Sequence, residues 1–187
     1  VLDLGCGRGG LLARLKQNDH RRLVGVELDE LKILAALRRG LDVIQADLNE
    51  GLRAFGDQQF DCVVLSQTLQ AVHDVEAVVE DMLRVGRTCI VSFPNFAYHK
   101  LRRMLAEDGR APKSAGLLHY EWYNTPNIRF FSIADFDDFC RRKNIIVHRR
   151  IALDTETGTE ALHDPNRNAD LAIFVISRSD GPVRSAP

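Results

Sequence analysis

Apolar residues along the chain follow two spacings in turn. Short uninterrupted apolar runs are typical of strands buried on both faces, and they alternate with stretches in which apolar residues recur every three or four positions, as on one side of a helix. Strands are predicted at residues 1–4, 22–27, 43–45, 60–66 and 88–93, and helices at residues 9–17, at residues 29–39 and beginning after Asp74. This alternation predicts a doubly wound, mostly parallel α/β sheet.

The pattern changes in the second half. Between residues 94 and 131 only one helix is indicated, at residues 98–107. A capping-box pattern, S-x-x-D from Ser132, then begins another helix. Two last apolar runs, at residues 145–153 and 169–177, predict strands whose polar connection is too short for a crossover helix, so we expect them to pair antiparallel. The complete expectation is a seven-stranded sheet with an antiparallel closing strand.

Composition narrows the class of protein. The 187 residues carry 25 Lys and Arg against 26 Asp and Glu, so neither nucleic acid nor a membrane surface is expected as a partner. No apolar run approaches the ~18 residues of a membrane-spanning helix. Four dispersed cysteines without a C-x-x-C pair argue against a disulfide framework or a metal site and for a cytoplasmic location. One domain is expected at residues 1–179, with an insert at about 94–131 and a disordered tail at 180–187.

A glycine-rich loop joins the first strand to the first helix, with the sequence GCGRGG at residues 5–10. Glycines permit a tight turn and the close approach of a ligand to the backbone, and the start of a helix offers unpaired N–H groups. Glu27 ends the second strand, where this type of sheet brings a carboxylate to the hydroxyls of a bound ribose. The loop also matches the G-x-G-x-x-G pattern of dinucleotide-binding proteins. By itself it leaves S-adenosylmethionine (SAM) and NAD both open.

Three further features favour SAM over NAD. Asp3 stands in the first strand, where a dinucleotide-binding strand is normally apolar, and its carboxylate suits a ligand with an ammonium group. Asp47 follows the third strand and offers an acceptor for an adenine amino group. The antiparallel closing pair is not the usual end of a dinucleotide-binding half-fold.

Several strings carry a resemblance to known families. VLDLGCG, GVELD, QADL and FDCVVLSQTL resemble the successive motifs of the class I SAM-dependent methyltransferases over nearly the whole chain. DVIQADLNEGL, LSQTLQAV, VSFPNF and YEWYNTPNI further resemble the MetW family of methionine biosynthesis. That resemblance implies SAM or its demethylated product, S-adenosylhomocysteine (SAH), as the ligand, and a homoserine O-acyltransferase as the partner.

The resemblance also implies which residues face the ligand. It places the methionine moiety at Asp3, Gly5, Gly7 and Gly9, the ribose at Glu27, the adenine at Asp47 and Leu48, and the sulfonium beside Ser66 and Gln67. Leu28 is a further expected cofactor-binding residue. Whether the chain transfers a methyl group stays open, and an active methyltransferase on an unidentified small molecule is the alternative function. An NAD-binding oxidoreductase is a more distant one.

No catalytic residue is assigned. Methyl transfer from an activated sulfonium needs positioning and at most a general base. Residues 66–69 lack the Asn/Asp-Pro-Pro-aromatic string of amino-directed methyltransferases, which disfavours that substrate class. His73, His99 and His119 are candidate bases, although each is more simply interpreted as a polar surface residue. Without a G-x-S-x-G elbow, the chain is not expected to be the acyltransferase itself.

The predicted insert is rich in aromatic residues. Eight of the chain's 13 aromatic residues lie between Phe93 and Phe131. The phenylalanines at its two ends are expected to fill a small core: Phe93, Phe130 and Phe131. The polar tips of Tyr120, Trp122 and Tyr123 suit an interface better. Because the insert leaves the carboxyl end of a strand, we predict that it forms a lid over the ligand cleft or a surface for a protein partner.

Overall fold

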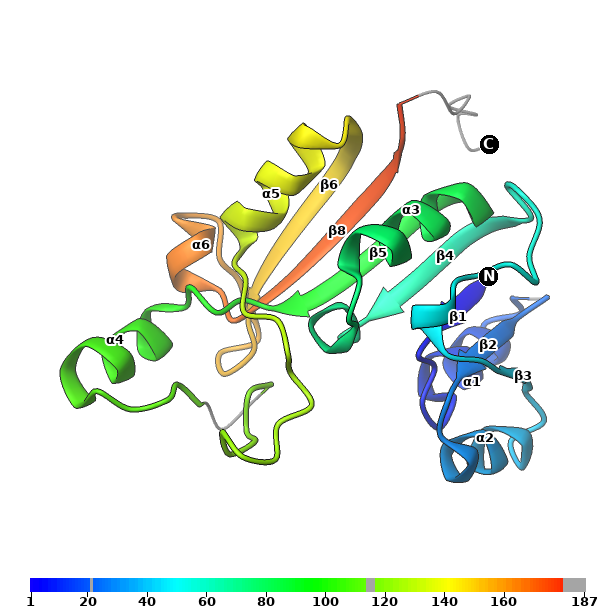
Figure 1. The fold of residues 1–187 in the computed structure, drawn as a ribbon, viewed down its shortest axis with the longest axis horizontal. Helices are drawn as coiled ribbons and strands as arrows, with labels where there is room; N and C mark the ends of the chain where they lie inside the picture. Colours follow the sequence, from blue (N-terminus) through cyan, green and yellow to red (C-terminus); the bar gives the residue numbers. More distant parts are fainter. Residues whose placement is uncertain (21, 114–116, 180–187) are drawn as a thin grey trace.

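The described chain folds around one eight-stranded sheet (Figure 1). The computed structural model describes residues 1–20, 22–113 and 117–179, so the tail predicted at 180–187 lies outside the described residues. The strands are β1 (Leu2–Leu4), β2 (Val24–Glu27), β3 (Asp42–Gln45), β4 (Phe60–Ser66), β5 (Gly86–Pro94), β6 (Ile145–Asp154), β7 (Thr159–Glu160) and β8 (Leu171–Arg178). Their order across the sheet is β3-β2-β1-β4-β5-β8-β6-β7. The first five are parallel and β8 is antiparallel to both its neighbours, which confirms the doubly wound sheet with an antiparallel closing strand.

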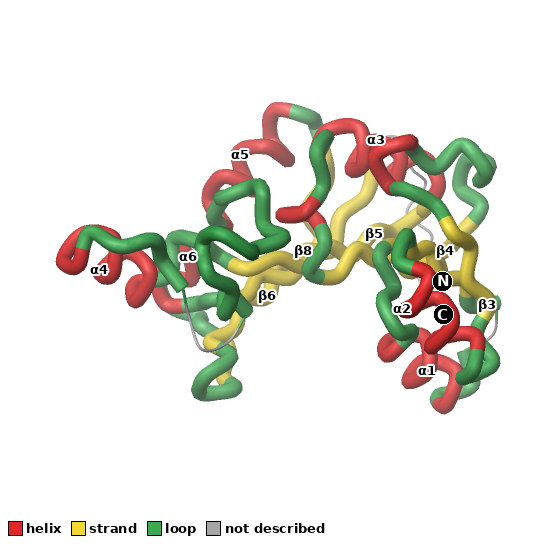
Figure 2. The backbone as a smooth tube through the Cα atoms, turned by 60° about the horizontal axis from the view of Figure 1, so that its bottom comes forward, coloured by secondary structure: helices red, strands yellow, loops and turns green. Residues whose placement is uncertain are grey.

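Helices cover the two faces of the sheet at different places. They are α1 (Gly10–Gln17), α2 (Glu30–Leu37), α3 (Val75–Val85), α4 (His99–Asp108), α5 (Ile133–Arg142) and α6 (Pro165–Asn168), with short 3-10 turns η1 (Leu48–Glu50) and η2 (Leu69–Ala71). In Figures 1 and 2, α1 and α2 lie beside β1 to β3, α3 and α5 lie on the other face, and α4 lies off the end of the sheet. No helix among the described residues has the length and apolar character needed to cross a membrane.

The predicted helix starts are confirmed by their capping bonds. The Asp29 carboxylate accepts hydrogen bonds from the first turn of α2, and the Asp74 carboxylate accepts one from the Ala77 N–H in α3 at 2.9 Å. At α5, the Ser132 hydroxyl accepts from the Asp135 N–H while the Asp135 carboxylate accepts from the Ser132 N–H, at 3.2 and 2.8 Å. These side chains satisfy N–H groups that a helix start leaves unpaired.

The segment between β6 and β8 differs from the prediction. The sequence predicts only a polar connection too short for a crossover helix, whereas the structure contains the two-residue strand β7, paired with the end of β6, and the single turn α6. β7 is therefore an eighth strand where seven were predicted. Elements of two or four polar residues carry no apolar periodicity, so only their tertiary pairing defines them.

The main core lies between the sheet and the helices α3 and α5. Phe93 stands at its centre, with ring centroids 4.6 Å from Phe131 and 5.0 Å from Phe136. Phe93 and Phe131 thus pack inside as predicted, but they belong to this main core and not to a small separate one. The prediction for Phe130 was wrong, because its side chain is 70% exposed and packs on Phe96 at the surface. Phe131 turns inward on this non-helical segment, and its neighbour turns outward.

The insert is fixed to the sheet at the fully buried Asn95. Its amide donates to the Asn166 and Ala169 carbonyls, and its side-chain oxygen accepts from the N–H groups of Ala97 and Ile133. One side chain thereby joins the end of β5, the start of α5 and the α6 segment.

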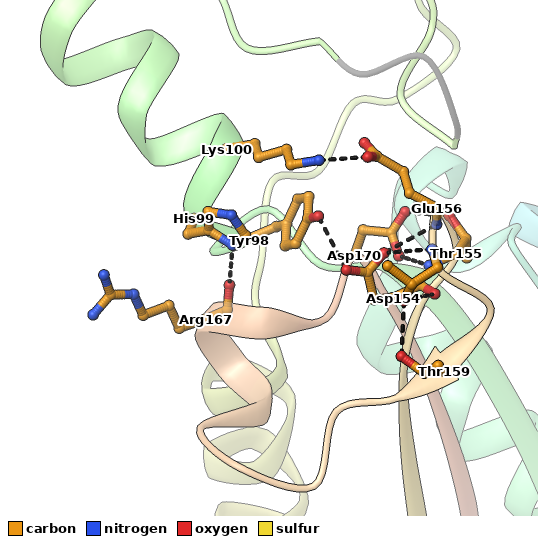
Figure 3. Close-up of polar contacts among 10 residues, drawn as sticks. Tyr98, His99, Lys100, Asp154, Thr155, Glu156, Thr159, Arg167 and Asp170 are labelled. Atoms are coloured by element: carbon orange, nitrogen blue, oxygen red, sulfur yellow. Dashed lines mark hydrogen bonds and ion pairs between the residues drawn. The ribbon is translucent and has the colours of Figure 1, made fainter.

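A second group of polar contacts docks α4 against the β6–β7 turn (Figure 3). The Tyr98 hydroxyl donates to Asp154 at 3.4 Å, and Lys100 forms an ion pair with Glu156. The imidazole of His99 contacts the Arg167 carbonyl at 3.3 Å. His99 therefore belongs to this docking contact.

Candidate functional site

The candidate site is built at the carboxyl ends of β1, β2 and β4, which are parallel neighbours in the sheet. Such ends are where doubly wound sheets bind their ligands. Gly5, Gly7 and Gly9 all have left-handed backbones, with φ of 68°, 58° and 73°. A β-carbon at Gly5 would lie 2.7 Å from the Thr68 hydroxyl, and one at Gly9 would lie 2.3 Å from Leu41, whereas one at Gly7 would meet nothing within 4 Å. Gly5 and Gly9 are thus needed for packing, and Gly7 faces open space.

Glu27 ties the glycine loop to the end of β2. Its buried carboxylate accepts a hydrogen bond from the Gly7 N–H at 2.8 Å with one oxygen. The other oxygen accepts from the N–H groups of Leu28 and Asp29 at 2.9 and 3.1 Å. Because a carboxylate has about four acceptor positions, Glu27 can hold the loop and still accept from a ligand hydroxyl. Leu28 takes part in this contact through its backbone N–H, and the residue is otherwise 57% exposed.

Asp3 is the unusual residue of the site. It is only 3% exposed, in the middle of β1, between strand partners Gly25 and Val64. Within the described part of the chain, no donor forms a hydrogen bond with its carboxylate. Burial, and secondly the charge of Glu27, raise the pKa of Asp3 from 3.8 to about 7. The charged form of a carboxylate in so buried a position is costly, and a cation binding there would offset that cost.

Asp47 and Leu48 begin η1, next to the end of β2. The Ala46 N–H donates to the Glu27 carbonyl at 3.2 Å, which brings this turn to the site. The Asp47 carboxylate accepts from the backbone and side-chain amides of Asn49, both at 2.8 Å. Asp47 is thus a cap for η1 as well as a candidate ligand contact.

The loop after β4 adjoins the glycine loop through Thr68, which faces Gly5. Ser66 forms a hydroxyl contact with Ser92 at 3.1 Å, and the Gln67 N–H donates to the Ser92 carbonyl at 2.8 Å. Gln67 has φ of 48°, a left-handed backbone that is costly for a residue with a side chain. The structure therefore brings Gly5, Glu27, Ser66 and Gln67 to one edge of the sheet.

The candidate bases are less well placed. His73 has an exposed side chain, and only its backbone is engaged, with its N–H donating to the Asn49 side chain at 2.8 Å. His99 is occupied at the docking contact of α4, and His119 stacks on Tyr120 in the insert. No group of three or more metal-binding side chains occurs among the residues that the structure describes. Neither a general base nor a metal centre emerges at the site from the described contacts.

Comparisons with known proteins agree with this geometry. A model of the family "Methionine biosynthesis protein MetW" matches residues 1–176. The chain belongs to the MetW family. It is 46% identical over 191 residues to the bifunctional methionine biosynthesis protein MetXA/MetW of Rhodopirellula baltica, covering 96% of this chain and 30% of that relative. The chain thus spans less than a third of the length of this curated relative.

Solved structures show the same fold. An S-adenosylmethionine-dependent methyltransferase from Mesorhizobium loti is similar at a TM-score of 0.70 and 17% identity, covering 95% of this chain and 89% of that one. A possible histamine N-methyltransferase from Thermotoga maritima is similar at a TM-score of 0.66 and 19% identity, covering 95% of this chain and 81% of that one. At these identities the likeness establishes the methyltransferase fold of this MetW-family chain.

Two of the strings that resemble MetW meet in space. Gln70, in LSQTLQAV, accepts hydrogen bonds at its backbone carbonyl from the N–H groups of Ile128 and Arg129, at 2.9 and 3.0 Å. Ile128 ends YEWYNTPNI, the string that contains the exposed Trp122. No local sequence pattern predicts these contacts of Gln70 or the contact of Thr68 with Gly5, because each involves a distant segment.

Proposed function

We propose that this MetW-family chain binds SAM or SAH at the glycine loop and acts together with a homoserine O-acyltransferase. The observation that carries the ligand assignment is the Asp3 carboxylate, buried beside Glu27 without a described hydrogen-bond donor. An ammonium group would supply the missing partner, and the methionine moiety of both ligands contains one.

The other residues fit the remaining parts of the same ligand. We assign the methionine moiety to Asp3 and the backbone of Gly5, Gly7 and Gly9, the ribose to Glu27 and Leu28, the adenine to Asp47 and Leu48, and the sulfur to Ser66 and Gln67. Bound SAM would supply an activated methyl group. The chain's own contribution is to hold the ammonium at Asp3 and the ribose hydroxyls at Glu27. NAD offers no ammonium group for Asp3.

Calorimetric titration with SAH, SAM and NAD tests the ligand assignment. We expect binding of SAH and SAM, and an affinity for SAH weakened by about 5- to 150-fold in Glu27→Gln, because a charged acceptor for the ribose is lost. Glu30→Gln, a neighbouring change in the first turn of α2, should bind as the unmodified chain does. Binding of NAD without a response to SAH or SAM would refute the assignment.

The partner assignment rests on the relative from Rhodopirellula baltica, whose name joins MetXA and MetW in one protein. Fusing two proteins raises their effective concentration toward each other, which is useful for proteins that act together. The length of that relative beyond the matched region leaves room for a second unit. We place the pair in the cytoplasm, where the four free cysteines of this chain would stay reduced.

The insert offers a suitable surface for this partner. Trp122 and Tyr123 are 76% and 70% exposed, with their rings 5.6 Å apart, and Tyr120 is 40% exposed. Large aromatic side chains held in water are unfavourable in isolation and are typical anchors of protein interfaces. We therefore propose the surface formed by Tyr120, Trp122 and Tyr123 as the contact with the acyltransferase.

Co-purification with the acyltransferase, followed by an acylation assay with and without this chain, tests the partnership. We expect a complex and faster acylation, and a loss of both in Trp122→Ala. Leu31→Ala is a matched control, because Leu31 is 79% exposed but lies on α2, beside the first strands of the sheet and away from α4 (Figure 1). The absence of a complex and of any change in acylation would instead favour a methyltransferase that works alone.

A further inference from the structure

Gln70 joins the candidate ligand site to the insert. Its side-chain amide donates to the Gln67 carbonyl at 2.7 Å, in the loop after β4. Its own carbonyl accepts from the N–H groups of Ile128 and Arg129, where the insert returns toward α5. Gln70 is only 6% exposed, so water competes little for these bonds. A single buried residue thus holds the site with its side chain and the insert with its backbone.

Two unfavourable features meet at this junction. Gln67 has the left-handed φ of 48°, and the Gln70 side-chain oxygen is buried without a hydrogen-bond partner among the described residues. The two residues are the acceptor and the donor of the same hydrogen bond. If Gln67 relaxed to an ordinary backbone conformation, that bond would break and the Gln70 amide would be free to turn. A ligand that contacts Gln67 would therefore act on the residue whose carbonyl holds the Gln70 amide in place.

A movement of Gln70 would reach the exposed part of the insert directly. Ile128 and Phe130, on either side of Arg129, are 39% and 70% exposed. The Arg129 guanidinium also donates to the His73 carbonyl, just beyond η2. The return segment of the insert is consequently held to the η2 region by both the backbone and the side chain of Arg129.

We propose that Gln70 couples occupancy of the ligand site to the conformation of the insert, so that binding of SAM or SAH changes the affinity of the chain for its protein partner. This inference rests on the proposed function, both for the ligand and for the partner surface. By linkage, the partner must change the affinity for the ligand by the same factor. Gln70 is a positioning residue in this scheme and need not touch the ligand.

Trp122 makes the coupling measurable without a label, because it is the only tryptophan of the chain and lies in the insert. We expect its fluorescence to change on titration with SAH, with the same half-saturation as in calorimetry. Gln70→Met keeps the volume of the buried side chain and removes both the amide donor and its unpaired oxygen. In this variant we expect SAH to bind within threefold of the unmodified affinity, and the Trp122 response to fall at least fivefold. Gln17→Met, on the exposed end of α1, is the matched control and should keep the full response.

Each other outcome has a distinct meaning. Calorimetric binding of SAH without any Trp122 response in the unmodified chain would refute the coupling and leave the proposed ligand intact. A full response in Gln70→Met would also refute it, because the signal would then arise without Gln70. If neither SAH nor SAM binds in calorimetry, the proposed ligand and the coupling fail together. With the acyltransferase present, SAH should shift the complex affinity in the unmodified chain and in Gln17→Met, but not in Gln70→Met.

Discussion

At the scale of the residue, Asp3 determines how the site responds to pH. In the folded chain its pKa is about 7, compared with 3.8 ordinarily, so the unfolded chain releases this proton at a lower pH than the folded chain does. The contribution of Asp3 to the free energy of unfolding is therefore greatest below about pH 4, falls as the pH rises to about 7, and is constant above that. Asp3→Asn cannot ionise at this position, so it does not lose this part of the free energy of unfolding as the pH rises.

We accordingly expect Asp3→Asn to be more stable than the unmodified chain at pH 8, by at most about 4 kcal/mol, the free energy equivalent of the pKa difference. Urea unfolding of both chains at pH 8 and pH 5 would measure the change. The advantage should shrink at pH 5. A difference that does not depend on pH would mean that Asp3 does not titrate as described.

The same carboxylate predicts pH-dependent ligand binding. Only ionised Asp3 attracts an ammonium group, and with a pKa of about 7 it is mostly protonated at pH 6 and mostly ionised at pH 8. The affinity for SAH should therefore rise about tenfold from pH 6 to pH 8, in proportion to the ionised fraction. Calorimetry at the two values measures this. In Asp3→Asn binding should be weak at both, and an unchanged pH dependence there would assign the effect to another group.

Two glycines of the loop should respond differently to the same change. Gly7→Ala strains a left-handed backbone by about 1–2 kcal/mol, and its new methyl group points into open space where the ligand is proposed to lie. Gly9→Ala adds to that strain a contact 2.3 Å from Leu41, so it should destabilise the fold considerably more. We expect Gly7→Ala to remain folded and lose affinity for SAH. Unfolding midpoints and calorimetry together distinguish the two, and equal destabilisation would contradict the assignment of Gly9 to packing.

At the scale of the element, Arg84 fastens α3 to the loop before β4. Its guanidinium donates to the Phe55 and Leu52 carbonyls at 2.9 and 3.0 Å, and it pairs with Asp57 and Asp81. Since several charge-assisted bonds depend on one side chain, Arg84→Ala should lower the free energy of unfolding by about 2–3 kcal/mol. Arg87→Ala is the control, because Arg87 is exposed and contacts Asp61 only at 3.9 Å, and it should change stability by less than about 1 kcal/mol. Urea unfolding measures both, and similar effects would contradict the role of Arg84.

The elements also show what sequence patterns can define. Long elements with regular apolar spacing and a capping residue, such as α3 after Asp74, were predicted closely. β7 was missed because two polar residues become a strand only by pairing with the end of β6. Phe130 was misplaced for a related reason, because composition does not tell which of two adjacent phenylalanines turns toward the core.

At the scale of the whole molecule, some features of the candidate site could be predicted from the sequence and others depend on tertiary packing. The glycine loop follows a predicted strand, and Glu27 and Ser66 end two others. Neighbouring parallel strands have their carboxyl ends at the same edge, so this gathering could be predicted. The buried state of Asp3 without a donor, and the bridge from Gln70 to Ile128, depend on how distant segments pack. A single sequence gives no local signal for either.

The position of β8 has a consequence for how the molecule forms. β8 is the last strand along the described chain, yet it lies between β5 and β6, which were both made earlier. β6 is therefore made before β8, the strand that joins it to β5, so the facing edges of β5 and β6 stay unpaired until β8 is added. Such pairing of late with early segments slows folding, and it leaves an open strand edge for chaperones or for another copy of the chain. Pairing of β8 with β5 and β6 closes that edge and joins β6 and β7 to the parallel strands.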